Sequence, residues 1–216
     1  MKLIRSAACT LLCLTSLPSF ALSEQGQIQL QTLQNRWAEI NYQLPEEQRE
    51  KAFASLSEQA QKAVAAEPNA AELQIWNGII LSTYAGAKGG LGALGLVKEA
   101  KASLEQGLAL DPKALSGSAY TSLGSLYYQV PGWPVGFGDD EKAEVMLKQA
   151  LAINPDGIDP NYFYGDYLAR AKRFDEAKAA LEKALLAPPR PDRQSADDGR
   201  KQDIQTLLNK VNAQLQ

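Results

Sequence analysis

The stretch Ile158–Pro189 constrains the fold more strongly than any other part of this 216-residue sequence. It begins with Asp159, which can cap a helix, and Pro160, which suits a first helical turn because no N–H is needed there. Further along, apolar residues recur at three- and four-residue steps: Phe174, Ala177, Leu181 and Ala184. Such steps place side chains on one face of a helix. The stretch therefore predicts two short helices joined by a tight turn and ended by proline.

Small residues, Gly165 and Ala177, stand where these two helices must approach closely. With their neighbours they resemble a tetratricopeptide (TPR) repeat. The residues at the signature positions of that family are Tyr164, Gly165, Phe174, Ala177, Leu181, Ala184 and Pro189. The resemblance implies an all-α fold, in which antiparallel helix pairs stack into a right-handed superhelix. It is specific for the fold and permissive for function.

Three similar units precede this one, and each also ends at a proline. The unit-ending prolines are Pro68, Pro112, Pro155 and Pro189. We predict a degenerate N-terminal helix pair over 22–68, three TPR-like repeats over 69–112, 113–155 and 156–189, and a linker with a capping helix over 190–216. The capping helix is expected to cover the apolar face of the last repeat.

The turn inside the repeat is not of constant length. From the glycine of the first helix to the first alanine of the second, the spacing is 12, 19 and 22 residues for the pairs Gly165–Ala177, Gly124–Ala143 and Gly78–Ala100. Only the last unit has the plain repeat length of about 34 residues. We therefore predict enlarged loops in the two preceding repeats, at Ala85–Gly95 and Val130–Glu141.

The N-terminus has the pattern of a secretory signal peptide. Lys2 and Arg5 precede the apolar run Ser6–Leu17, and small residues allow cleavage after Ala21. The run is too short for a membrane span, although a retained N-terminal anchor is the alternative. A periplasmic or otherwise secreted protein is the prediction.

Removal of 1–21 would change the available chemistry. Both cysteines, Cys9 and Cys13, would leave, and the sequence has no histidine. Thiolate nucleophiles, Cys/His metal sites and Ser-His-Asp triads are then excluded, and we predict no cofactor, no metal site and no catalytic residue. Paired carboxylates could still perform acid–base chemistry, but most acidic residues lie beside lysines, as on a solvated surface.

The mature chain is predicted to be mildly acidic. Lys plus Arg falls from 22 to 20 with the loss of Lys2 and Arg5, while Asp plus Glu stays at 25, so the net charge moves from −3 to −5. This balance does not favour nucleic acid as a partner. No later segment is apolar enough to span a membrane. The sequence does not indicate an oligomeric state.

The concave face of the first helices is the predicted binding surface. The resemblance implies that peptides are held there, and mixed aromatic and polar side chains suit an extended peptide. The candidate residues are Glu72, Ile75, Ile79, Thr121, Ser125, Tyr128, Tyr162, Asp166 and Arg170. A solvated or self-packed face is the alternative. Only Arg170 approaches the basic clamp of family members that bind chaperone tails.

The two predicted loops hold further candidates. Lys88 lies in the glycine-rich segment Ala85–Gly95, which either binds an anion through backbone N–H groups or forms a packed turn. Trp133 and Phe137 lie in Val130–Glu141. They are either an exposed partner-binding tip or fold back onto the tyrosines of the preceding helix. The acidic end of this loop has too few oxygen ligands for a calcium site.

Two functions remain open. The first is a non-catalytic interaction or scaffold module that binds a peptide or a partner protein. The second is an accessory ligand-binding subunit of an exported transport system, because the expanded repeats faintly resemble the TPR partners of TRAP-type transporters. A deep apolar cavity lined by Trp76, Tyr84 and Trp133 would favour the second, and a shallow open groove the first.

Overall fold

The computed structural model describes residues 22–216, so the predicted signal peptide lies outside the described residues. The described part is built from helices and contains no strand, which confirms the predicted all-α fold. The elements are α1 (Glu24–Tyr42), α2 (Glu46–Ala66), α3 (Ala71–Lys88), α4 (Ala93–Leu110), the 3-10 helix η1 (Ala114–Gly117), α5 (Ser118–Gln129), α6 (Asp140–Ile153), α7 (Ile158–Arg170), α8 (Phe174–Leu185) and α9 (Gln194–Gln214).

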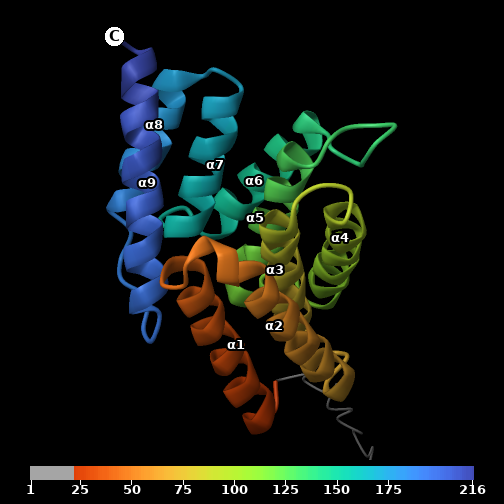
Figure 1. Cartoon of the computed structure of the whole chain (residues 1–216). Coiled ribbons are helices and arrows are strands. Elements are labelled where there is room, and N and C mark those ends of the chain that lie inside the picture. The colour runs from red at the N-terminus through yellow and green to blue at the C-terminus, as the bar shows by residue number, and fades with distance from the viewer. Residues whose placement is uncertain (1–21) are drawn as a thin grey trace, which may run out of the picture.

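Each helix packs against the next one along the chain, from α1 to α9, so the molecule is a stack of helix pairs (Figure 1). The first helices of successive pairs, α1, α3, α5 and α7, also contact one another in order. The last helix, α9, covers α7 and α8 as a capping helix should, and it also reaches α1 at the opposite end of the stack. The stack is therefore closed on itself by α9.

Three of the helix pairs are held by the same glycine–leucine contact. A Cβ atom built on the glycine of the first helix would lie 2.5–2.7 Å from the leucine Cγ of the second, in the pairs Gly78–Leu104, Gly124–Leu147 and Gly165–Leu181. These three leucines are fully buried. Because real Cβ atoms do not approach a carbon this closely, glycine is required for the helices to reach their packing distance.

The two expanded repeats differ in how they use their extra residues. In the repeat over 113–155, the segment between α5 and α6 is an irregular loop, as predicted, and Asp139 caps α6 by accepting a hydrogen bond of 3.0 Å from the backbone N–H of Lys142. In the preceding repeat, the predicted loop Ala85–Gly95 is wrong. There α3 continues to Lys88 and α4 already begins at Ala93. The surplus lengthens both helices, and Gly89 ends α3 with a φ of +63°.

Substitution of Gly124 by alanine tests the glycine–leucine contact. We expect the free energy of unfolding to fall by about 1–3 kcal/mol, because the new methyl group overpacks against Leu147. Gly86 on α3 is the matched control, since a Cβ there meets no atom within 4 Å. Gly86→Ala should be neutral or stabilising by up to about 1 kcal/mol. Urea unfolding of both variants checks the pair, and equal effects would contradict the packing account.

Candidate functional site

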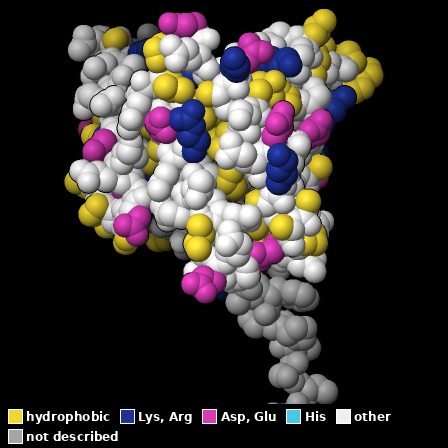
Figure 2. All heavy atoms as spheres, turned by 60° about the horizontal axis from the view of Figure 1, so that its bottom comes forward, with side chains coloured by type: hydrophobic (Ala, Val, Ile, Leu, Met, Phe, Trp, Pro, Cys, Tyr) yellow, Lys and Arg dark blue, Asp and Glu magenta, His cyan; other side chains and the backbone are white. Residues whose placement is uncertain are grey.

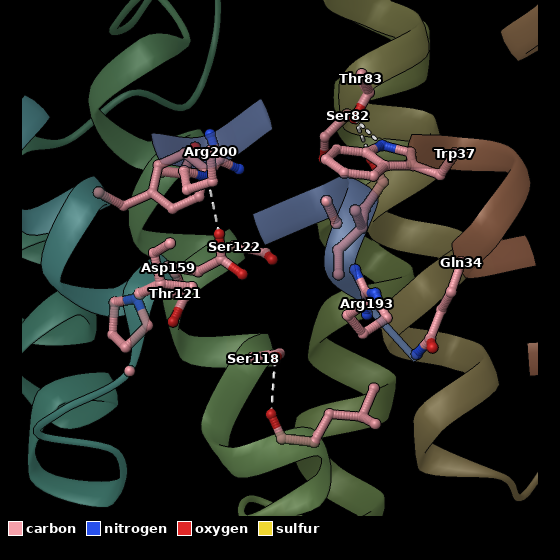
Figure 3. A pocket seen from close by; sticks show the side chains of 18 of the residues that line it. Gln34, Trp37, Ser82, Thr83, Ser118, Thr121, Ser122, Asp159, Arg193 and Arg200 are labelled. Carbon is pink, nitrogen blue, oxygen red and sulfur yellow. Dashed lines mark hydrogen bonds and ion pairs between the residues drawn. The ribbon is translucent and has the colours of Figure 1, made fainter. Parts of the chain in front are cut away.

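A cavity of about 760 Å³ lies on the concave side of the stack. Its lining comes from the first helices α1, α3, α5 and α7, from the segment 188–193 and from α9 (Figure 3). The cavity is therefore bounded on one side by the inner faces of the helix pairs and on the other by the closing helix. Both aromatic and charged side chains line it.

Two tryptophans form the aromatic part of the wall. The rings of Trp37 on α1 and Trp76 on α3 meet edge to face, with 5.9 Å between their centroids. The indole N–H of Trp37 donates a 2.9 Å hydrogen bond to the hydroxyl of Thr83, which in turn donates to the carbonyl of Ile79. These contacts fix both rings, so they offer a rigid apolar surface to a ligand.

Small hydroxyl side chains cover much of the remaining wall. They come from α3 and from the region of α5, and they are Ser82, Thr83, Ser116, Ser118, Thr121, Ser122 and Ser125. Two consecutive wall residues, Leu115 and Ser116, have left-handed backbone conformations with φ of 49° and 55°. Non-glycine residues adopt this region rarely and at a cost. The packing around the cavity therefore stabilises an unfavourable local backbone.

A network of ion pairs forms the opposite wall. The carboxylate of Asp159 on α7 binds Arg190 at 2.6 Å and Arg200 at 2.8 Å. Arg190 also binds Asp197 at 2.6 Å, and Arg200 binds Asp203 at 2.9 Å. We expected Asp159 to cap α7, but Gly157 occupies the cap position. Asp159 instead joins α7 to the segment before α9 and to α9 itself.

The two arginines determine the charge of Asp159. Burial by itself would raise the pKa of this carboxyl group, but the positive charges of Arg200 and Arg190 outweigh burial and hold the pKa below its usual value. Asp159 therefore stays ionised at neutral pH. The two arginines compensate the charge of this half-buried carboxylate.

The closure between α9 and α1 depends on Gly199. A Cβ atom built there would lie 2.3 Å from the ring carbon Cγ of Tyr42, so α9 can cross this ring only with glycine at that position. Two hydrogen bonds flank the crossing. The Tyr42 hydroxyl bonds to the Asp203 carboxylate at 3.2 Å, and the Gln43 amide donates to the Ser195 hydroxyl at 2.9 Å.

Arg193 differs from Arg190 and Arg200, the two arginines of the ion-pair network. Within residues 22–216 it makes no ion pair, and its guanidinium carbon lies 4.9 Å from the centroid of the Trp76 ring. Burial lowers the pKa of Arg193 below its usual value, and the charge of Arg190 lowers it further. Arginine nevertheless keeps its proton at neutral pH. The cavity wall thus holds a partly buried cation without a carboxylate partner in the described chain.

Three of the nine predicted concave-face residues line the cavity: Ile79, Thr121 and Ser125. Ile75 does not lie on an accessible face. It is fully buried against Gly107 of α4, because that glycine lets α4 approach closely. Glu72 is half-buried at the start of α3, outside the cavity.

The other four predicted residues contact one another or α9. The Tyr128 hydroxyl bonds to Asp166 at 2.8 Å, and Arg170 binds the same carboxylate at 3.2 Å. Burial, and then the nearby Asp166, raise the pKa of Tyr128. The Tyr162 ring lies under the Arg200 guanidinium at 4.4 Å. Their role in binding stays a prediction, although the structure gives each of them a protein partner.

The loop candidates lie away from the cavity. Lys88 lies over the Tyr84 ring at 5.5 Å. Trp133 is 90% exposed in the loop between α5 and α6, and this loop projects from the stack (Figure 1). Phe137 folds back onto Tyr127 with 5.8 Å between ring centroids. The loop therefore exposes Trp133 and folds Phe137 back, and partner binding by Trp133 stays a prediction.

Sequence reasoning missed the arginines of the cavity. Arg190, Arg193 and Arg200 lie in the segment that we expected to be only linker and cap. A signal is visible afterwards, since three arginines and three aspartates fall within Arg190–Arg200. Trp37, which lies in the predicted N-terminal helix pair, was missed as well. Neither the charge pattern nor the helix prediction says which distant helix these residues meet.

Among residues 22–216, no group of three or more His, Cys, Asp or Glu side chains is arranged to hold a metal ion. None of the helices in this part of the chain is long and apolar enough to cross a membrane. On the face shown in Figure 2, acidic and basic side chains are interspersed rather than separated by sign.

Comparisons with known proteins agree with the architecture. A family model described as tetratricopeptide repeat matches residues 136–196. Similar solved structures include MamA, at 23% identity and a TM-score of 0.44 over 78% of this chain and 92% of that one. Another is a thermophilic TPR protein of Thermus thermophilus, at 17% identity and a TM-score of 0.46, over 87% of this chain and 99% of that one. Likenesses at this level do not bear on function. No protein with a curated description matches the sequence.

The ion-pair network predicts how Asp159→Asn behaves. Loss of the carboxylate leaves two arginines without it, so the free energy of unfolding at pH 7 should fall by about 3 kcal/mol. The pKa of Asp159 is lower in the folded chain than its ordinary value of 3.8. Its contribution is therefore complete above that value and is lost as the pH falls toward the folded-state pKa.

Urea unfolding at pH 7 and at pH 3 measures this difference. The difference in the free energy of unfolding between the parent protein and Asp159→Asn should be smaller at pH 3 than at pH 7. The exposed Asp175, which makes no ion pair in the described residues, is the control, and Asp175→Asn should change stability by less than about 0.5 kcal/mol. If this difference is small at pH 7, or if it grows on acidification, the stabilising role of Asp159 in the ion-pair network is contradicted.

Proposed function

We propose that this tetratricopeptide-repeat protein is a non-catalytic interaction module of the periplasm, which holds a segment of a partner protein in the cavity closed by α9. The TPR architecture suggests protein partners. The export signal, the peptide ligand and the absence of catalysis are parts of the proposal.

The observation that carries the proposal is the composition of the cavity wall. Hydroxyl groups from α3 and α5, including Ser82, Thr121 and Ser122, can bond the N–H and C=O groups of a peptide backbone. The rings of Trp37 and Trp76 provide an apolar surface for one of its side chains. A peptide needs both, because each backbone polar group that leaves water has to be paired.

The closing helix limits the length of chain that the cavity can hold. A volume of about 760 Å³ is enclosed in part by α9, in contrast to an open groove along the whole stack. A chain end or a short loop therefore fits this site better than a long extended segment.

The same volume favours a second candidate, a ligand-binding subunit of an exported transport system. Pockets for small molecules are typically about 300–1,000 Å³ and are partly enclosed. Of the three aromatic residues that we expected in such a cavity, Trp76 lines it, whereas Tyr84 and Trp133 do not. The two candidates differ in the source of the ligand, and the capture experiment below separates them.

A side chain that fills the cavity should prevent the protein from binding its partner. Ser122 lies in the wall on α5, and Ser122→Trp places an indole in the open volume. The control is Ser55→Trp, because Ser55 is exposed on α2 outside the cavity. Tagged parent and variants are used to capture proteins from periplasmic extract, with circular dichroism to verify folding.

We expect the parent and Ser55→Trp to capture the same proteins. Ser122→Trp, although folded, should not capture them. Partners retained by Ser122→Trp would contradict the cavity as the binding site. Retained partners that Trp133→Ala loses would assign binding to the exposed loop. A small molecule that co-purifies with the parent, without any protein, would favour the transport subunit.

Export gives a separate prediction. If the signal is cleaved after Ala21, the intact mass of the protein from the periplasmic fraction should correspond to a chain that begins at Leu22. A mass that includes residues 1–21, with the protein in the membrane fraction, would show a retained anchor. Recovery of the uncleaved chain in the cytoplasm would contradict export.

A further inference from the structure

We infer that Arg193 and Trp76 form a binding site for the carboxylate of an amphipathic ligand, in which an apolar group lies close to the carboxylate. This inference rests on the proposed function, because it names the chemistry of the ligand held in the same cavity.

Arg193 combines two features: it makes no ion pair within residues 22–216, and it lies over the Trp76 ring. Arg190 and Arg200 are each neutralised by two carboxylates, from the set Asp159, Asp197 and Asp203. Arg49, which also lines the cavity, donates a 2.9 Å hydrogen bond to the carbonyl of Leu44 and lies away from the two tryptophans in sequence, on α2. Arg193 has no ion pair within residues 22–216, although Asp159 and Asp197 act on it at longer range. A partly buried cation gains most from an anion that brings its own charge into the cavity.

The position of Arg193 is fixed before a ligand arrives. Its guanidinium lies over the Trp76 ring, and a stacked guanidinium keeps the N–H groups at its edge available for bidentate bonds to a carboxylate. Gln34 of α1 also lines the cavity and is labelled in Figure 3. The Gln34 amide can donate a further hydrogen bond to an anion.

The aromatic neighbours define the rest of the ligand. Trp76 lies under Arg193, and Trp37 meets Trp76 edge to face at 5.9 Å. An apolar group attached near the carboxylate would therefore cover the two rings while the carboxylate pairs with the guanidinium. Two sources share this chemistry: the C-terminal residue of a peptide with an apolar side chain, and a small organic acid.

Tryptophan fluorescence can report this binding directly. The sequence has three tryptophans, so Trp133→Phe leaves Trp37 and Trp76 as the only indoles, both in the cavity wall. In this background three probes are titrated. N-acetyl-leucine represents a peptide C-terminus, 4-methylpentanoate represents a small organic acid, and N-acetyl-leucinamide is the neutral counterpart of the first.

We expect saturable binding of at least one of the two carboxylates, and binding of the neutral amide that is weaker by about tenfold or more. Arg193→Gln should remove this preference, and Arg193→Lys should weaken it less, because it keeps the charge but not the planar fork. Arg36→Gln is the control, since Arg36 forms an exposed pair with Glu39 outside the cavity. It should leave every affinity unchanged.

The two carboxylate titrations also distinguish a peptide C-terminus from a small organic acid as the ligand. Preference for N-acetyl-leucine over 4-methylpentanoate indicates a peptide end, and the reverse indicates a small acid. Equal binding of the acid and the amide, unchanged affinities in Arg193→Gln, or no binding of either carboxylate would overturn the inference. If Ser122→Trp still abolishes partner capture in that case, the proposed function stands without the carboxylate site.

Discussion

The carboxylate of Asp159 is the point on which the closed arrangement depends. It lies on α7 and binds one arginine from the segment before α9 and one from α9 itself. A stack of helix pairs by itself is open along its concave face. The ion pairs hold α9 across that face, and the contact of Gly199 with Tyr42 allows α9 to reach α1. The cavity therefore exists because charges far apart in the sequence meet.

The scaffold beneath this closure relies on a different kind of interaction. Each of three repeats brings its helices together through a glycine that faces a buried leucine. These contacts are apolar, local and repeated, so they specify the distance between helices without specifying a ligand. The particular features of the protein come from what is added to the repeats: longer helices α3 and α4, an exposed loop with Trp133, and the arginine-rich approach to α9.

The sequence was sufficient for the fold because its signals are local. The stripe of Phe174, Ala177 and Leu181 and the facing Gly165 lie within one repeat, so periodicity alone pairs the two helices. The glycine-rich segment at 85–95 was misread as a loop, since glycine weakens a helix without forbidding it. There α3 ends only where the backbone turns left-handed, at Gly89.

The site was less predictable because it is assembled over long range. Thr121 and Ser125 were found from their place on a first helix, but Arg193 and Trp76 are more than 100 positions apart in the sequence. No periodicity relates them. Ile75 illustrates the opposite error: its helix was correct, but Gly107 on the neighbouring helix, rather than solvent, determines what it faces.

A cross-link between α1 and α9 tests the closure most directly. Residues 22–216 contain no cysteine, so Gln43→Cys with Ser195→Cys supplies the only thiols of this part of the chain. The Gln43 amide nitrogen and the Ser195 hydroxyl oxygen, which these thiols replace, lie 2.9 Å apart. Treated with a short bis-maleimide under native conditions, this variant should be linked within the chain almost completely, as peptide mass spectrometry can show. A yield no higher than that of the urea-unfolded protein would contradict a cavity closed by α9.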